Sequence, residues 1–282
     1  AKYDAFTVGE TVFVTPKMAD DLVNPARGEL STVFAFEHME TDCYKIKWFL
    51  RRFSPDRFFA CLTKWQKALP WNTVYLENHD QPRSVSRFGN DTQYHDESAK
   101  ALATLVLTLR GTPFLYEGQE IGMTNFDFSG MEKVQDVESI NIWNMGKQLH
   151  LPYSLRWRMI KTKSRDNART PMLWDDTMNA GFTTGTPWIR MHQDVKTLNV
   201  KAQEQDPTSV LNCYRDLIKL RKDPRFAEIM IYGLFIPMQS SDDEVIAYKR
   251  KLSAGEITVI SNLSLHDTQF DLKGKILYQT GK

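Results

Sequence analysis

The sequence predicts an α/β protein in which a domain with a parallel sheet is followed by a small antiparallel β domain. Over the first 223 residues, apolar strand-like segments alternate with helical patterns, and this alternation is typical of βα units that build a parallel sheet. After Pro224, short β-rich segments are separated by the turns SAGE, SLHD and KGK, which is typical of an antiparallel sheet. We therefore expect one domain over residues 1–223 and a second over residues 225–282.

The predicted strands are segments in which β-branched and aromatic residues are concentrated. Those of the first domain are, in chain order, Asp4–Gly9, Thr32–Phe36, Asn72–Leu76 and Thr112–Tyr116. Those of the second domain are Val245–Leu252, Ile257–Leu263, Thr268–Leu272 and Lys275–Gln279.

The helices between these strands are indicated by their start and stop signals. Ser54 precedes a helix over Pro55–Ala68 with proline in its first turn, and Gly111 follows the end of a helix over Ser98–Leu109. Two further helices are expected over Ser154–Lys161 and Thr208–Lys222. The first two have the right length for crossover helices of a parallel sheet.

Composition and charge give no indication of a nucleic-acid or membrane partner. The chain has 36 Lys and Arg against 35 Asp and Glu, so its formal charge of +1 gives no reason to expect nucleic acid or a membrane surface. The longest apolar run, Ala101–Leu109, is too short to span a bilayer. Cys43, Cys61 and Cys213 are odd in number and form no metal-binding pattern, which favours a reducing, cytoplasmic compartment.

Two carboxylates follow two of the predicted strands. Glu10 comes after AFTVG, and Asp80 comes after TVYLENH. The carboxyl ends of parallel strands meet on the ligand face of an α/β fold, so these two residues could share one site. Alternatively, Asp80 caps a helix and Glu10 is an exposed loop carboxylate. A pair of carboxylates suits glycoside cleavage, and a retaining enzyme needs them about 5 Å apart.

Four motifs occur in an order that resembles the α-amylase family of glycoside hydrolases. They are TVGE at 7–10, ENHDQPRSVSRFGND at 77–91, GTPFLYEGQEIGMTN at 111–125 and SRDNARTPMLWDD at 164–176. Within that family, NAGFTTGTPWI at 179–189 and the stretch from NPARGEL to FEHM at 24–39 resemble the oligo-1,6-glucosidase and glucan 1,6-α-glucosidase branch.

The resemblance implies a fold in which residues 1–223 supply strands five to eight of a TIM-type (β/α)8 barrel. Residues 225–282 would then form most of a small antiparallel β-sandwich domain. The family's nucleophilic Asp lies on the fourth strand, in a motif with an Arg two residues before it, and this motif does not occur here. We therefore expect the N-terminal half of the same barrel to be needed for activity.

The resemblance also implies roles for individual residues. Glu10 would be the general acid/base, and Asp80 would stabilise the oxocarbenium-like transition state. His79 and Arg165 would bind the glucose, and Glu138 and Lys47 would contact the second sugar. Arg169 and Arg83 are expected to be structural. No cofactor is expected, because hydrolysis involves none. No metal site is expected either, because the structural metal sites of the family, where present, lie mainly in the other half of the barrel.

The activity implied is that of a retaining α-glucosidase that releases terminal glucose from α-1,6-linked oligosaccharides by double displacement. An α-1,4-glucosidase, a trehalose-6-phosphate hydrolase and sucrose-acting relatives share nearly all of the motifs and stay open. A different class also stays open, namely a noncatalytic scaffold such as the glucosidase-like ectodomain of amino-acid transporter heavy chains.

Overall fold

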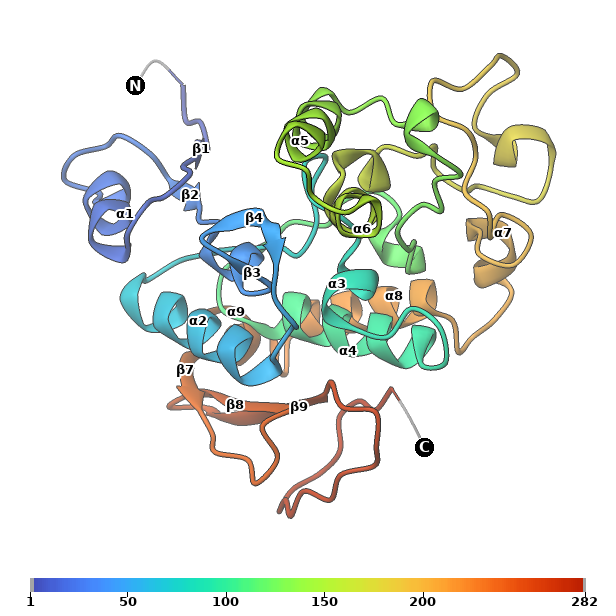
Figure 1. Ribbon diagram of the computed structural model, residues 1–282. Helices are drawn as coiled ribbons and strands as arrows, with labels where there is room; N and C mark the ends of the chain where they lie inside the picture. Colours follow the sequence, from blue (N-terminus) through green and yellow to red (C-terminus); the bar gives the residue numbers. More distant parts are fainter. Residues whose placement is uncertain (1–2, 281–282) are drawn as a thin grey trace.

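The computed structural model describes residues 3–280 and contains four short strands that pair in parallel (Figure 1). They are β1 (Val8–Glu10), β2 (Thr32–Phe34), β5 (Thr73–Val74) and β6 (Thr112–Pro113). β1 pairs with β2 and β5 pairs with β6, in both cases in parallel. The Thr73 hydroxyl on β5 donates to the Val33 carbonyl on β2 at 2.8 Å, so the two pairs lie side by side. The four strands thus have the parallel direction and the chain order that the sequence predicts.

Helices and loops connect these strands and follow them in the chain (Figure 1). The helices are α1 (Pro16–Val23), α2 (Pro55–Ala68), α3 (Ser84–Phe88), α4 (His95–Thr108), α5 (Val137–Gln148), α6 (Tyr153–Lys163), α7 (Val200–Glu204), α8 (Val210–Lys222) and α9 (Ala227–Tyr232). Short 3₁₀ turns include η1 (Glu37–Glu40) and η4 (Arg165–Ala168). A hairpin of β3 (Cys43–Tyr44) and β4 (Ile46–Leu50) precedes α2. Among residues 3–280, no helix is both long enough and apolar enough to cross a bilayer.

α2 has the bounds that the sequence predicts, because its signals are local. The Ser54 hydroxyl accepts from the backbone N–H of Arg57 at 3.3 Å, and Pro55 occupies the first turn, where its missing N–H costs no hydrogen bond. Phe58 and Trp65 point inward from the same face and are buried. This face fixes α2 against the core.

α4 is largely buried and contributes many side chains to the largest hydrophobic cluster. Leu102, Leu105 and Val106 are each 1% exposed. The same cluster includes Leu217 from α8 and Tyr248 from the C-terminal sheet. The helices and the C-terminal part of the chain therefore share one core.

The C-terminal sheet is antiparallel, as predicted, but it has three strands among residues 3–280. They are β7 (Leu234–Pro237), β8 (Val245–Leu252) and β9 (Gly255–Asn262), in the order β7-β8-β9. The strands predicted at Thr268–Leu272 and Lys275–Gln279 are wrong, since both segments are irregular. Most of their side chains are exposed, and without an apolar face they gain little by pairing. Among residues 225–280, no second sheet is formed, although a sandwich requires one.

Candidate active site

The loop that carries His79 and Asp80 follows β5. A buried ion pair between Glu77 and Arg83 holds this loop in place. The Glu77 carboxylate accepts from Arg83 Nη1 at 3.0 Å and from the Ser84 backbone N–H at 2.8 Å. Arg83, which is 0% exposed, also donates to the Glu117 carbonyl at 2.6 Å. Arg83 therefore supports, as expected, the loop that carries the exposed His79 and the half-buried Asp80.

The proposed N-cap role of Asp80 is wrong. α3 begins at Ser84 with Arg83 at its N-cap, and no side chain caps it. The Asp80 backbone N–H instead donates to Asn78 Oδ1 at 2.8 Å, in a local turn. The Asp80 carboxylate is thus free of any capping role and faces two arginines.

Those arginines come from the two ends of η4. Arg169 Nη2 lies 2.7 Å from Asp80 Oδ1, and Arg165 Nη1 lies 3.6 Å from the same oxygen. His79 Nε2 lies 3.6 Å from the other oxygen, Oδ2. The η4 turn thus brings two permanent positive charges to one carboxylate.

Arg165 is held in turn by Asp136, a residue that the sequence reasoning missed. Arg165 Nε and Nη2 lie 2.8 and 2.6 Å from Asp136 Oδ1, and Ser139 Oγ donates to Oδ2 at 2.7 Å. Burial alone would raise the pKa of Asp136, but these hydrogen bonds outweigh it and lower the pKa to about 2. Asp136 also caps α5 by accepting from the Glu138 backbone N–H at 3.1 Å. A capping aspartate before a helical pattern is the signal that could have identified it.

Glu138, in the first turn of α5, meets the β3–β4 hairpin. Lys47 Nζ lies 2.6 Å from Glu138 Oε2, and Trp48 Nε1 donates to Oε1 at 3.2 Å. Arg165 Nε lies 3.7 Å from the same carboxylate. Lys47 and Glu138, which were predicted as contacts of one sugar, therefore pair with each other.

Five of the six predicted site residues thus form one continuous network of charged and polar groups. The structure brings together His79, Asp80, Arg165, Glu138 and Lys47.

Glu10 stands apart from that network. It is the exposed last residue of β1 and pairs in register with Phe34 of β2. Its carboxylate has no hydrogen bond or ion pair among the residues that the structure describes. Its charge acts on Tyr75, whose pKa is raised by burial and, in the same direction, by Glu10. Glu10 therefore lies at the carboxyl ends of the parallel strands, near β5 but unpaired among the described residues.

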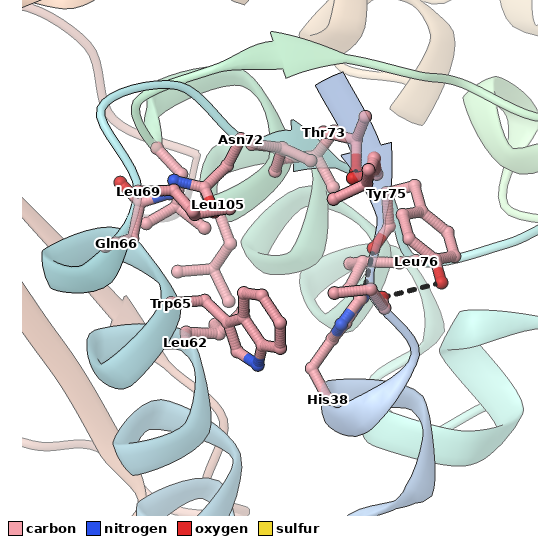
Figure 2. Close-up of a pocket in the computed structure, with 15 residues that line it drawn as sticks. His38, Leu62, Trp65, Gln66, Leu69, Asn72, Thr73, Tyr75, Leu76 and Leu105 are labelled. Carbon is pink, nitrogen blue, oxygen red and sulfur yellow. Dashed lines mark hydrogen bonds between the residues drawn. The ribbon is translucent and has the colours of Figure 1, made fainter. Parts of the chain in front are cut away.

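A small cavity lies elsewhere, between α2, α4 and the strands (Figure 2). Its volume is about 30 Å³, and His38, Trp65, Asn72 and Leu105 are among the side chains around it. This is room for about one water molecule, so it is a packing gap and not a sugar site. Within residues 3–280, no group of three or more His, Cys, Asp or Glu is arranged to hold a metal ion.

Comparison with known proteins gives consistent matches over the whole chain. Residues 1–233 match the family described as "Alpha amylase, catalytic domain". The chain is 45% identical over 286 residues to the oligo-1,6-glucosidase of Parageobacillus thermoglucosidasius, covering 99% of this chain and 50% of that protein. It is 36% identical over 280 residues to the glucan 1,6-alpha-glucosidase of Streptococcus pneumoniae, covering 97% and 52%.

Solved structures match equally well. The trehalose-6-phosphate hydrolase of Bacillus licheniformis superimposes with a TM-score of 0.89 at 38% identity, covering 98% of this chain and 50% of that one. The isomaltulose synthase of Klebsiella sp. LX3 gives a TM-score of 0.88 at 35% identity, covering 93% and 48%. The chain spans about half the length of the curated relatives it matches.

Proposed function

Because the chain belongs to the alpha-amylase family, we propose that it is the part of a retaining α-glucosidase that carries the acid/base and most of the sugar-binding side chains. The full-length protein would release terminal glucose from short α-1,6-linked oligosaccharides. The observation that carries this proposal is the convergence of His79, Asp80 and Arg165 with the Lys47–Glu138 pair in one network. Relatives named oligo-1,6-glucosidase and glucan 1,6-alpha-glucosidase support the substrate class.

In this proposal the strands β1, β2, β5 and β6 are strands five to eight of a (β/α)8 barrel. Residues 1–223 would form that half of the barrel, and residues 225–282 would form a C-terminal domain packed against it. Two parallel strand pairs that follow each other in the chain, with α1 between β1 and β2 and with α3 and α4 between β5 and β6, support this assignment. The nucleophilic carboxylate would come from the other half of the barrel, which the full-length protein must supply.

Glu10, Asp80 and Arg165 would have separate tasks in this mechanism. Glu10, unpaired among the described residues and exposed, would protonate the glycosidic oxygen and later activate water, as the second step of a double displacement requires. Asp80 would bind the sugar hydroxyls and stabilise positive charge as it develops on the ring. Arg165, fixed by Asp136, would hold the glucose in one orientation.

Trehalose-6-phosphate hydrolase is a second candidate, because enzymes of that name are among the similar structures. The charges of the network favour a neutral second sugar. Lys47, Arg165 and Arg169 are matched by three carboxylates, those of Asp80, Asp136 and Glu138. A phosphate would find each of these cations already paired and would meet the negative charge of Glu138.

The test replaces Glu10 by Gln in the full-length protein and measures glucose released from isomaltose, maltose and trehalose 6-phosphate. We expect the wild type to prefer isomaltose and Glu10→Gln to lose activity by roughly 10³-fold. Glu29→Gln is the matched control, because Glu29 is an exposed carboxylate on the same part of the chain that pairs only with Arg27 among the described residues. Full activity of Glu10→Gln would contradict the acid/base assignment. Absence of glucose release by the wild type from all three substrates would favour the noncatalytic scaffold.

We further propose that this enzyme works in the cytoplasm. Cys43, Cys61 and Cys213 are all free and buried, which suits a reducing compartment.

A further inference from the structure

Arg169 lies against both residues of the His79–Asp80 pair. Its Nε donates to the His79 carbonyl at 2.9 Å, and its Nη2 donates to Asp80 Oδ1 at 2.7 Å. These two nitrogens form one edge of the planar guanidinium, so a single rigid group fixes a main-chain atom and the adjacent side chain together. The expectation that Arg169 is only structural therefore needs revision.

The two oxygens of the Asp80 carboxylate have different surroundings. Oδ1 receives Arg169 at 2.7 Å and lies 3.6 Å from Arg165 Nη1. Among the described residues, Oδ2 accepts no hydrogen bond, and its one ion-pair contact is His79 Nε2 at 3.6 Å, which is beyond hydrogen-bonding distance. The carboxylate is thus anchored through one oxygen and open at the other.

We propose that Arg169 is a positioning residue that anchors Oδ1 of Asp80, so that Oδ2 is the oxygen presented to the sugar hydroxyls. This inference rests on the proposed function and deepens it, because it assigns separate tasks to the two oxygens. Arg169 acts through Asp80 and does not itself react. Its loss leaves the carboxylate present but free to rotate, and a rotated carboxylate stabilises the transition state less well.

The effect should appear mainly in kcat. A lysine at position 169 keeps the charge but cannot donate from a planar edge to both acceptors, so we expect Arg169→Lys to lower kcat/KM about tenfold. Arg169→Met removes both donors, and we expect a loss of about 100-fold. If the methionine variant does not fold, the lysine variant, which retains the charge, carries the test.

The experiment is a double-mutant cycle in the full-length protein with p-nitrophenyl α-D-glucopyranoside as substrate. The variants are Arg169→Lys, Asp80→Ala and the two combined, each checked by thermal denaturation. If Arg169 acts through Asp80, Arg169→Lys should change kcat/KM less than about twofold once Asp80 is alanine. Arg190→Lys is the matched control, because Arg190 also donates to a main-chain carbonyl, that of Asp127 at 2.9 Å, and lies over the Phe126 ring.

Two results would overturn this inference and leave the proposed function intact. One is unchanged kcat/KM for Arg169→Lys in an active enzyme, and the other is an equal loss in the presence and absence of the Asp80 carboxylate. A wild type that hydrolyses neither this substrate nor isomaltose would overturn the proposed function as well.

Discussion

Lys163 is buried, and its environment differs from that of a normal surface lysine. It is 1% exposed, and its Nζ lies 2.6 Å from Asp42 Oδ1. Arg87 Nη2 approaches the same oxygen at 2.8 Å, so two buried cations share one buried carboxylate. Burial and the charge of Arg87 lower the pKa of Lys163 to about 8, against the opposing attraction of Asp42.

This lowered pKa predicts a pH dependence of stability with a definite sign. Folded Lys163 loses its proton near pH 8, whereas the unfolded chain keeps it to about 10.5. Between these values the unfolded state binds more protons, so the free energy of unfolding should rise with pH by up to roughly 1.4 kcal/mol per pH unit. Below pH 8 both states are protonated and this contribution is constant.

Urea unfolding of the wild type and Lys163→Met measures the effect. Their difference in unfolding free energy should move in favour of the wild type by roughly 2 kcal/mol between about pH 7 and about pH 10. Lys161→Met is the control, because Lys161 has a side chain that is 44% exposed and, among the described residues, pairs only with Asp127 at 3.1 Å. A difference between wild type and Lys163→Met that is constant over this range would show that Lys163 titrates normally.

Single residues of the site differ in how far sequence could predict their positions. His79 and Asp80 could be placed near other polar groups because they directly follow a strand. Asp136 has a capping signal, but its contact with Arg165 and the contact of Arg169 with Asp80 could not be predicted, because both are distant in sequence. Arg169 and its hydrogen-bond partner Asp80 are 89 residues apart in the sequence, and Arg165 and its partner Asp136 are 29 residues apart. Such pairs are set by how the loops pack and not by any local pattern.

At the scale of helices and strands, local start and stop signals predicted the bounds of elements well. A composition rich in β-forming residues, without such signals, did not predict strands reliably. The helix over Pro55–Ala68 and the strand over Val245–Leu252 have their predicted bounds, since a capping residue marks the start of the helix and the SAGE turn marks the end of the strand. The hairpin of β3 and β4 was missed because it is short and its turn residue, Lys45, has a φ of 59° that its residue type does not suggest. In the wrongly predicted C-terminal segments, Leu272 and Ile276 are 46% and 71% exposed.

The pairing of β5 with β6 depends on one glycine. Gly111 has a φ of 139°, and a Cβ there would lie 2.1 Å from the Asn72 carbonyl oxygen. That same oxygen accepts from the Thr112 backbone N–H at 2.9 Å. Any side chain at position 111 would therefore force β6 away from β5.

We expect Gly111→Ala to lower the free energy of unfolding by about 3 kcal/mol or more, since backbone strain and a steric clash act together. Gly274→Ala separates the two effects, because Gly274 has a similar φ of 146° and a Cβ there would meet no described atom within 4 Å. That control should lose only about 1 kcal/mol. Urea denaturation compares the two variants, and equal losses would mean that the close approach to Asn72 is unimportant.

Across the whole molecule, two buried arginines join the C-terminal sheet and the last helices to the end of α4. Arg250 of β8 is 0% exposed and donates to the carbonyls of Thr108 at 2.5 Å and Gly233 at 2.8 Å. Arg221 of α8 donates to the Leu107 carbonyl at 2.9 Å. Carbonyls at a helix C-terminus are unpaired and carry partial negative charge, so they suit a cation that has no carboxylate partner.

The shared core and these arginines predict that the sheet and the helices unfold as one unit. The chain offers a probe for this, because all seven of its tryptophans lie between residues 48 and 188, outside the sheet. Replacing Arg250 by Met leaves buried carbonyls without donors and should cost about 3 kcal/mol. If unfolding is cooperative, the tryptophan fluorescence transition in urea should move to lower concentration although the substitution is in the sheet.

Lys251→Met is the matched control for this prediction. Lys251 is the next residue of β8, its side chain is 57% exposed, and its ion pair with Glu256 at 3.9 Å is too long to stabilise the fold much. Lys251→Met should leave the urea midpoint of the tryptophan fluorescence transition unchanged. A tryptophan transition unchanged in Arg250→Met would mean that residues 225–282 unfold independently. A shift confined to Arg250→Met would instead mean that the sheet, although remote from Asp80 in the chain, stabilises the strands that hold the candidate site, because α4 packs against both.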